Sequence, residues 1–288
     1  MMVSLTYELS PLRMKFENGL YNYVGLVRVT TSKGNRFMLP FGASHADKYM
    51  GRELAISELI ERVTWANVKS SMKTKNTLTS VGYAAHVDLR QAVIHSCLER
   101  MEHILLQSIT NGIRRNDVVP FCRKKNTVTW CFAIPLFGHL YYTIVMLYKG
   151  DGFLSYGMGS SDSKEDGFEK AALECNRACA VMRAKAVTPD FLSYHAYEEL
   201  YTITQLLYDR VVSFVDLWEE DDPNDLTDLV PHNVDLGVLR KIRVFDVTNL
   251  CPSAFLKDRI VTCCIDASDK NVALFFLKNG GKEIAIEI

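Results

Sequence analysis

Apolar and polar residues alternate along residues 20–41 and again along residues 127–148, each time around a short polar turn. Alternation with a period of two is typical of strands that bury one face, so each segment predicts a β-hairpin. The turns lie at Ser32–Asn35 and Phe137–His139. The same reasoning predicts further strands, which lie at residues 153–157, 241–248, 259–265, 272–278 and 283–288.

Between these segments, apolar residues recur at helical spacing and predict helices at residues 47–68, 88–107, 167–185 and 196–218. Asp88 with Gln91, and Asp166 with Glu169, have the spacing of capping boxes and place the starts of two of them. Short runs of small residues at 42–45 and from Gly82 predict turns before the first two helices. Strands and helices do not alternate strictly, so we expect an α+β fold with mixed or antiparallel sheets.

Composition narrows the class of protein. The 288 residues are 48% apolar and 23% charged, as in a globular protein with a sizeable core, and we expect a single domain over residues 1–288. A net charge of −1 gives no reason to expect nucleic acid as a partner. No apolar run is long enough to cross a membrane, and the first residues do not resemble a secretion signal. Eight cysteines without a C-x-x-C pair indicate reduced thiols, and we expect a cytoplasmic location.

Charged residues three apart recur on three predicted helices, as Glu58-x-x-Glu61-Arg62, Glu99-x-x-Glu102-His103 and Glu174-x-x-Arg177. Each motif places its charges on one helical face. If the faces converge, the carboxylates repel one another, and a hard divalent cation such as Mg²⁺ would relieve the repulsion. Metal ions on such a cluster indicate phosphoryl chemistry on a nucleotide. The alternative is that these are solvated helix faces.

Familiar catalytic and phosphate-binding motifs are missing from the sequence. It contains no G-x-x-x-x-G-K-[ST], no G-x-G-x-x-G after a strand, no G-x-S-x-G and no H-E-x-x-H. A nucleotide would therefore need an unconventional site made of carboxylates and metal ions. His95 and His103 are not assigned as a general base, because surface or core positions explain them better.

Three blocks occur in the order expected of a known family. They are AISELIER at residues 55–62, the segment from Gly82 to His103, and GMGSSDSKEDGFEKAALECNRA at residues 157–178. The strand that ends in Asp246-Val247-Thr248 follows them. Together these features resemble the YcaO superfamily, ATP-dependent enzymes that activate peptide-backbone amides, and the resemblance covers about residues 42–266. It implies a YcaO-like fold in which acidic helix faces converge on a nucleotide site.

The resemblance also implies a set of site residues. The Mg²⁺ and ATP ligands would be Glu58, Glu61, Glu99, Glu102 and Glu174. Arg62 would orient phosphate or carboxylate groups. Ser44 lies in a turn that approaches the nucleotide in relatives, and Arg177 stands at a glutamine position of the third block, so both are further candidates for nucleotide binding.

As a function, the resemblance implies ATP- and Mg²⁺-dependent phosphorylation of a backbone amide, which yields an azoline, a thioamide or an amidine. The substrate would be a ribosomal precursor peptide, as in the maturation of bacteriocins and other modified peptides. A separate maturation protein and a homodimer are further expected partners, whereas nucleic acid and membrane are not expected.

Several positions depart from the family pattern and support another reading. Leu54 stands at a serine position, His103 at an arginine position, Ile104 at an aspartate position and Arg177 at a glutamine position. The connector between the first two blocks is short, and the C-terminus GGKEIAIEI lacks a proline-rich tail. The alternative is therefore a degenerate, non-catalytic YcaO-like partner that binds a precursor peptide or a modification enzyme. A third reading is an unrelated α+β protein with charged helix faces.

Overall fold

The chain divides into two compact units, each described here by itself. Unit 1 comprises Met1–Arg100 and Arg240–Ile286, and unit 2 comprises Met101–Leu239 and Glu287–Ile288. Both contain helices and mostly antiparallel strands, which confirms the predicted α+β class. The expectation of a single domain stays a prediction. The computed structural model describes residues 4–17, 19–32, 34, 36–72, 80–111, 122–124, 127–150, 153–187, 201–209, 232–233 and 241–286.

The first sheet of unit 1 is built around β3 (Leu20–Thr31), which pairs with β4 (Arg36–His45) on one side. The other side of β3 pairs with β1 (Leu5–Leu9) and β2 (Arg13–Glu17), and every pairing is antiparallel. The first predicted hairpin is thus confirmed. The turn predicted at residues 42–45 is wrong, because β4 continues to His45, with Gly42 opposite Val24 in the register.

The second sheet of unit 1 has the order β13–β11–β12–β5, again antiparallel throughout. Its strands are β5 (Tyr83–His86), β11 (Ile242–Asp246), β12 (Ile260–Asp266) and β13 (Lys282–Ile284). The predicted turn from Gly82 therefore leads directly into a strand. Asp246 ends β11 by accepting hydrogen bonds from the backbone N–H and the hydroxyl of Thr248, which gives the Asp-x-Thr motif a structural role.

Helices connect and cover these sheets. A 3₁₀ turn, η3 (Thr248–Leu250), and the short α6 (Ser253–Leu256) link β11 to β12. The strand predicted at residues 272–278 is wrong, because this segment is a helix, α7 (Lys270–Lys278). Its buried residues Val272, Ala273 and Phe276 follow helical spacing, and the Asp269 carbonyl accepts from two of its first N–H groups.

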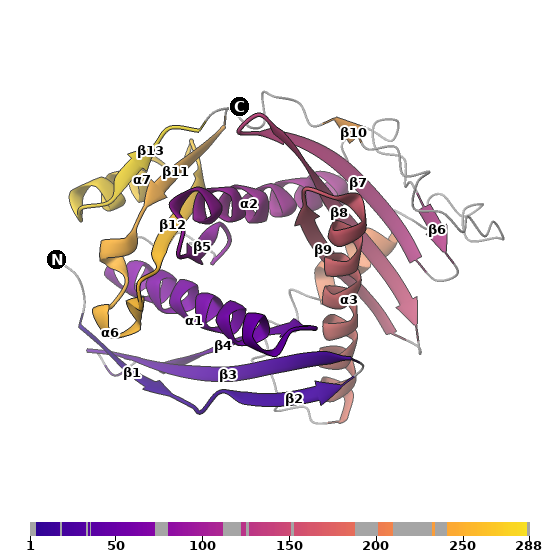
Figure 1. The fold of residues 1–288 in the computed structure, drawn as a ribbon, viewed down its shortest axis with the longest axis horizontal. Helices are drawn as coiled ribbons and strands as arrows, with labels where there is room; N and C mark the ends of the chain where they lie inside the picture. The colour runs from indigo at the N-terminus through magenta and orange to yellow at the C-terminus, as the bar shows by residue number, and fades with distance from the viewer. Residues whose placement is uncertain are drawn as a thin grey trace. The chain divides into compact units, whose positions relative to one another are not determined.

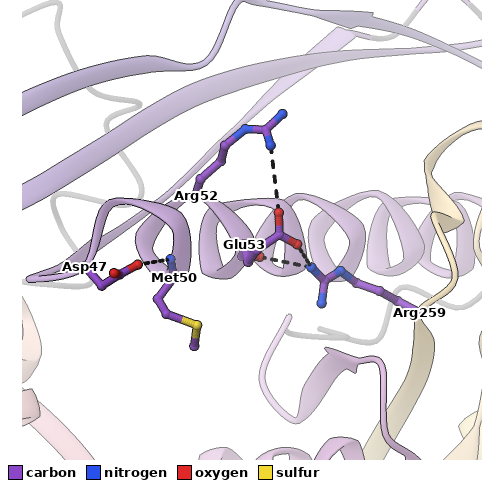
Figure 2. Close-up of polar contacts among 5 residues, drawn as sticks. All are labelled: Asp47, Met50, Arg52, Glu53 and Arg259. Carbon is purple, nitrogen blue, oxygen red and sulfur yellow. Dashed lines mark hydrogen bonds and ion pairs between the residues drawn. The ribbon is translucent and has the colours of Figure 1, made fainter.

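The helix α1 (Lys48–Ser71) packs against β3 and β4 in unit 1 (Figure 1). Asp47 caps it by accepting a hydrogen bond from Met50 N at 2.8 Å. Glu53 lies between Arg52 and Arg259, and Figure 2 shows both contacts. Arg259 is only 8% exposed, so its ion pair with Glu53 fixes the first part of α1 to the residue before β12. The core of this unit includes Val27, Phe41, Ile60, Val63, Phe245 and Phe276.

The helix α2 (Leu89–Asn111) begins after Asp88, as predicted. Asp88 accepts a hydrogen bond from Gln91 N at 2.9 Å. The second half of the expected capping box is made differently, because Asp88 N donates to His86 Nδ1. The predicted core face is confirmed by the burial of Val93, Cys97, Met101 and Leu105. Residue 100 is the last of unit 1, so Glu99 belongs to unit 1 and Glu102 to unit 2.

Unit 2 contains a sheet in the order β10–β7–β8–β9, with β6 also paired to β7. The second predicted hairpin is confirmed as β7 and β8. The helix α3 packs on β9 and β8 (Figure 1), and Cys131, Ile144, Met146, Ala171 and Cys175 form a core there. The elements are β6 (Cys122–Lys124), β7 (Thr127–Leu136), β8 (His139–Gly150), β9 (Phe153–Ser161), α3 (Lys164–Val187) and β10 (His232–Asn233).

Some sequence boundaries in unit 2 need correction. The helix α3 begins three residues before the predicted start, because the Ser163 hydroxyl, not Asp166, caps it and accepts from Asp166 N at 3.1 Å. Residues 201–209 are helical, within the helix predicted at 196–218, and the rest of that segment lies outside the described residues. No helix in the described ranges is both long and apolar enough to cross a membrane. The seven cysteines whose side chains are described are buried and free.

Candidate functional site

Two glutamates of α1 contact the backbones of both sheets of unit 1. Glu58 Oε2 accepts a hydrogen bond from Gly42 N of β4 at 2.7 Å. One turn later, Glu61 Oε1 accepts from Ala85 N of β5 at 2.8 Å. Hydrogen bonds from backbone N–H groups to carboxylates are strong and fix the direction of the side chain. The Glu-x-x-Glu spacing therefore places two adjacent carboxylates, each held by a different sheet.

Arg62 and Glu99 join these carboxylates. Arg62 Nη2 donates to Glu58 Oε1 at 3.1 Å, and Arg62 Nη1 donates to Ser80 Oγ at 2.5 Å. Burial alone would lower the pKa of Arg62, but Glu58, Glu99 and Glu61 together raise it, so the guanidinium stays charged. Glu99 Oε2 accepts from Gly82 N at 3.1 Å. We call Glu58, Glu61, Arg62 and Glu99 the unit 1 cluster.

A second arrangement of the same kind lies in unit 2. Glu174 Oε2 accepts a hydrogen bond from Met158 N of β9 at 2.5 Å. Glu102 of α2 is hydrogen-bonded to Ser160 and lies within electrostatic range of Glu174. We call Glu102 and Glu174 the unit 2 pair. The structure thus groups the five predicted glutamates as three in unit 1 and two in unit 2.

Glycines allow the strands to come close enough for these contacts. A Cβ on Gly157 would lie 2.1 Å from the Ala171 carbonyl oxygen, and one on Gly159 would lie 2.4 Å from that of Gly167. The Gly-x-Gly sequence of β9 therefore lets α3 pack directly on the strand backbone, with Met158 N facing Glu174. Gly82 combines a φ of +84° with a Cβ position 2.3 Å from the Cys264 carbonyl oxygen. These glycines serve packing and support the glutamates.

Two of the carboxyl groups have strongly perturbed acidity. Burial raises the pKa of Glu61 to about 7, and neighbouring Glu58 adds to the rise against the opposing effects of Ala85 N–H and two arginines. Burial also raises the pKa of Glu102 to about 7, and the Glu174 charge adds to it. A carboxylate that is desolvated beside another carboxylate keeps its proton unless a cation compensates the charge. The unit 1 cluster and the unit 2 pair thus each contain one glutamate whose negative charge is not fully compensated by nearby positive charge.

We expect the substitutions Glu61→Gln and Glu102→Gln to stabilise the metal-free protein more as the pH rises. A pKa raised from 4.5 to about 7 favours the protonated form in the native state. Wild-type stability should then fall between about pH 4.5 and pH 7 as the unfolded chain loses this proton first, and stay low above pH 7. The gain from each substitution should grow by up to about 3 kcal/mol over this window.

Urea unfolding at pH 4.5 and at pH 8, in the presence of a chelator, measures this gain. Glu8→Gln is the matched control, because Glu8 is exposed and forms an ion pair with exposed Arg28. A gain that is the same at both pH values would contradict the raised pKa of the glutamate concerned.

The donors fit Mg²⁺ in kind. Carboxylate oxygens are hard ligands, and Mg²⁺ is commonly held by one or two carboxylates while phosphate oxygens and water complete its shell. Across the described part of the chain, no three His, Cys, Asp or Glu side chains are grouped to hold a metal ion by themselves. The described carboxylates therefore match Mg²⁺ in kind and do not form a complete protein cage.

The remaining candidate residues lie outside these groups. The Ser44 hydroxyl donates to Asn22 Oδ1 at 2.5 Å across the β3–β4 pair, in a strand instead of a turn. Arg177 is exposed on α3. Glu174, three residues before it on the same helix, accepts a hydrogen bond from the backbone N–H of Met158. The ring of His95 meets that of His86 edge-on, with centroids 5.7 Å apart. His103 is partly exposed on α2.

Three polar residues next to the unit 1 cluster and the unit 2 pair were not predicted from the sequence. They are Ser80 beside Arg62, and Ser160 and Lys170 beside Glu102. Lys170 stands four residues before Glu174, so helical spacing could have revealed it. Ser80 and Ser160 carried no such signal, because a serine near a turn or a strand end is common.

Comparisons with known proteins give a distant structural likeness. No protein-family model matches the sequence, and no curated protein matches it. Among solved structures, the chain is similar to "The structure of YcaO from Methanopyrus kandleri bound with AMPPCP and Mg2+", with a TM-score of 0.49 and 11% identity. The match covers 90% of this chain and 85% of that chain.

Proposed function

We propose that the chain binds ATP with Mg²⁺ and uses it to activate a backbone amide of a ribosomal precursor peptide. The observation that carries the proposal is the pairing of carboxylates in both units. In each unit, one glutamate with its pKa raised to about 7 lies within electrostatic range of another. Ordinary solvated helix faces would leave these carboxyl groups hydrated and acidic.

Named residues would hold the metal and the nucleotide. Glu58, Glu61 and Glu99 would provide Mg²⁺ ligands in the unit 1 cluster, and Glu102 and Glu174 would do so in the unit 2 pair. Each of Glu58, Glu61, Glu99 and Glu174 has one carboxylate oxygen fixed by a backbone N–H, which orients the side chain in advance. When bound, Mg²⁺ supplies positive charge that neutralises the phosphate oxygens.

The sequence resemblance supports amide activation as the chemistry. A nucleophile adds to the amide carbon, the amide oxygen takes the γ-phosphoryl group of ATP, and ADP leaves. Inorganic phosphate then departs with that oxygen, so an azoline, a thioamide or an amidine remains. In this scheme the protein acts by positioning and by charge. Arg62 keeps its positive charge next to three carboxylates and would orient phosphate or carboxylate groups.

A non-catalytic partner protein is the second candidate. One observation favours it: Leu54 is 41% exposed on α1, at the position where the resembled motif has a serine hydroxyl. An apolar side chain there offers no ligand to a phosphate or a metal. In this role the chain would bind a precursor peptide or a modification enzyme and would turn over little ATP.

Phosphate release from ATP separates the two candidates. We expect wild-type protein with Mg²⁺ and peptides rich in Cys, Ser and Thr to release phosphate, with loss of water from the modified peptide by mass spectrometry. Glu99→Gln should lower the rate at least about tenfold, because it removes a charged ligand while its amide can still accept from Gly82 N. If the protein binds the nucleotide but releases no phosphate from ATP with any of the peptides, the partner role is favoured. If it binds no nucleotide, the enzyme role is excluded.

A further inference from the structure

Lys170 lies next to the unit 2 pair and has no role in the function proposed so far. It is four residues before Glu174 on α3, one helical turn away. Its Nζ donates to the Ser160 carbonyl oxygen at 2.9 Å. Ser160 is buried at the end of β9, its hydroxyl lies 2.7 Å from Thr143 Oγ1, and it is hydrogen-bonded to Glu102. Ser160 therefore connects the ammonium group of Lys170 to the carboxyl group of Glu102.

When Glu102 and Glu174 are both ionised, the charges of this arrangement do not balance. Lys170 brings one positive charge, whereas Glu102 and Glu174 can bring two negative ones. A divalent cation on the pair would reverse the balance and leave one net positive charge. That excess charge suits an anionic oxygen next to the metal.

The ammonium group is chemically suited to such an oxygen. Lysine is a compact point charge with three donors on a flexible stem, and it is a common ligand of phosphate groups. The hydrogen bond to the Ser160 carbonyl uses one of these donors and holds Nζ at the end of β9. Lys170 is an exposed residue, so an incoming ligand can reach its side chain.

We propose that Lys170 binds a terminal phosphate group of the nucleotide and gives the unit 2 pair its preference for polyphosphates over monophosphates. This inference rests on the proposed nucleotide function. The competing explanation is structural: Lys170 only ties α3 to β9 through the Ser160 carbonyl. The two explanations differ in whether the positive charge of Lys170 matters. A structural tie needs only a hydrogen-bond donor, whereas phosphate binding needs a cation.

Calorimetric titrations with a non-hydrolysable ATP analogue and with AMP, both with Mg²⁺, compare the two. Lys170→Gln keeps an N–H donor and removes the charge, whereas Lys170→Arg keeps both. We expect Lys170→Gln to weaken binding of the ATP analogue at least about tenfold and to change AMP binding less than about twofold. Lys170→Arg should recover most of the lost affinity. Lys164→Gln is the matched control, since Lys164 is on the same helix with its ammonium over the Tyr142 ring.

The outcomes separate this inference from the proposed function. If the wild-type protein binds the ATP analogue and Lys170→Gln binds it with the same affinity, the role of Lys170 is overturned while the proposed function stands. Equal losses for the ATP analogue and for AMP would also overturn the role of Lys170, because a general disturbance of the site has that effect. A wild-type protein that binds neither nucleotide would refute the proposed function and this inference together.

Discussion

Gly157→Ala is expected to lower the free energy of unfolding by about 3 kcal/mol or more. A Cβ at this position would lie 2.1 Å from the Ala171 carbonyl oxygen and 2.5 Å from Cys175 N, both backbone atoms of α3. Backbone atoms cannot rotate away as side chains do, so α3 and β9 must separate, and overpacking of this kind costs from about 1 to 3 kcal/mol or more. The same separation would draw Glu174 away from Met158 N, to which it is hydrogen-bonded.

Chemical denaturation measures the loss, and Gly138→Ala is the control. Gly138 lies in the β7–β8 turn with a φ of +70°, and a Cβ there would meet no atom within 4 Å. Its replacement should therefore cost only the backbone strain, about 1 kcal/mol. Equal losses for the two variants would show that close packing of β9 on α3 is not what Gly157 provides.

Much of the fold could be predicted because burial leaves a periodic trace in the sequence. Both hairpins alternate apolar and polar residues, and the structure pairs β3 with β4 and β7 with β8 as expected. The core face of α2 was predicted from Val93, Cys97 and Met101, which recur every four residues and are buried. The capping role of Asp88 followed from its own side-chain chemistry and needed no tertiary contact.

The errors lie where tertiary contacts decide the structure. The segment 272–278 is short and mostly apolar, so its period is ambiguous. It forms a helix whose Phe276 packs on Phe245 of β11. Residues 42–45 look like a turn because they are small and polar. They form a strand since β3 pairs with them and the outer N–H of Gly42 donates to Glu58. Gly42 is needed for close approach, because a Cβ there would lie 2.1 Å from the Tyr23 carbonyl oxygen, and the sequence alone does not distinguish such a glycine from one in a turn.

The candidate site shows the same division. Helical spacing predicted charged pairs on three helix faces but could not show which faces converge. In the structure, Glu58, Glu61 and Glu99 all act on Arg62. Helical spacing also could not predict which backbone N–H groups hold these carboxylates, because their donors lie 16, 24 and 17 residues away in the sequence. Contacts over such distances follow from sheet register, which single-sequence patterns do not specify.

Removing one carboxylate of the unit 1 cluster is expected to weaken magnesium–nucleotide binding, which is the second large effect that we predict. Glu58→Gln and Glu99→Gln keep the size and an acceptor oxygen, so Gly42 N and Gly82 N retain partners. Each removes a full negative charge that would face Mg²⁺. We expect the affinity for a magnesium–ATP analogue to fall about 10-fold to 100-fold in each variant. Glu8→Gln, an exposed glutamate of β1, should leave it unchanged.

The most direct test of the account is a calorimetric titration of wild-type protein and Glu99→Gln with a non-hydrolysable ATP analogue, in Mg²⁺ and in a chelator. If the glutamates hold a magnesium–nucleotide complex, wild-type protein binds the analogue in Mg²⁺ and binds it far more weakly in the chelator. Glu99→Gln then loses most of the binding seen in Mg²⁺. Wild-type binding that is equally strong in the chelator, or that Glu99→Gln leaves unchanged, would contradict the claim that these glutamates hold a magnesium–nucleotide complex.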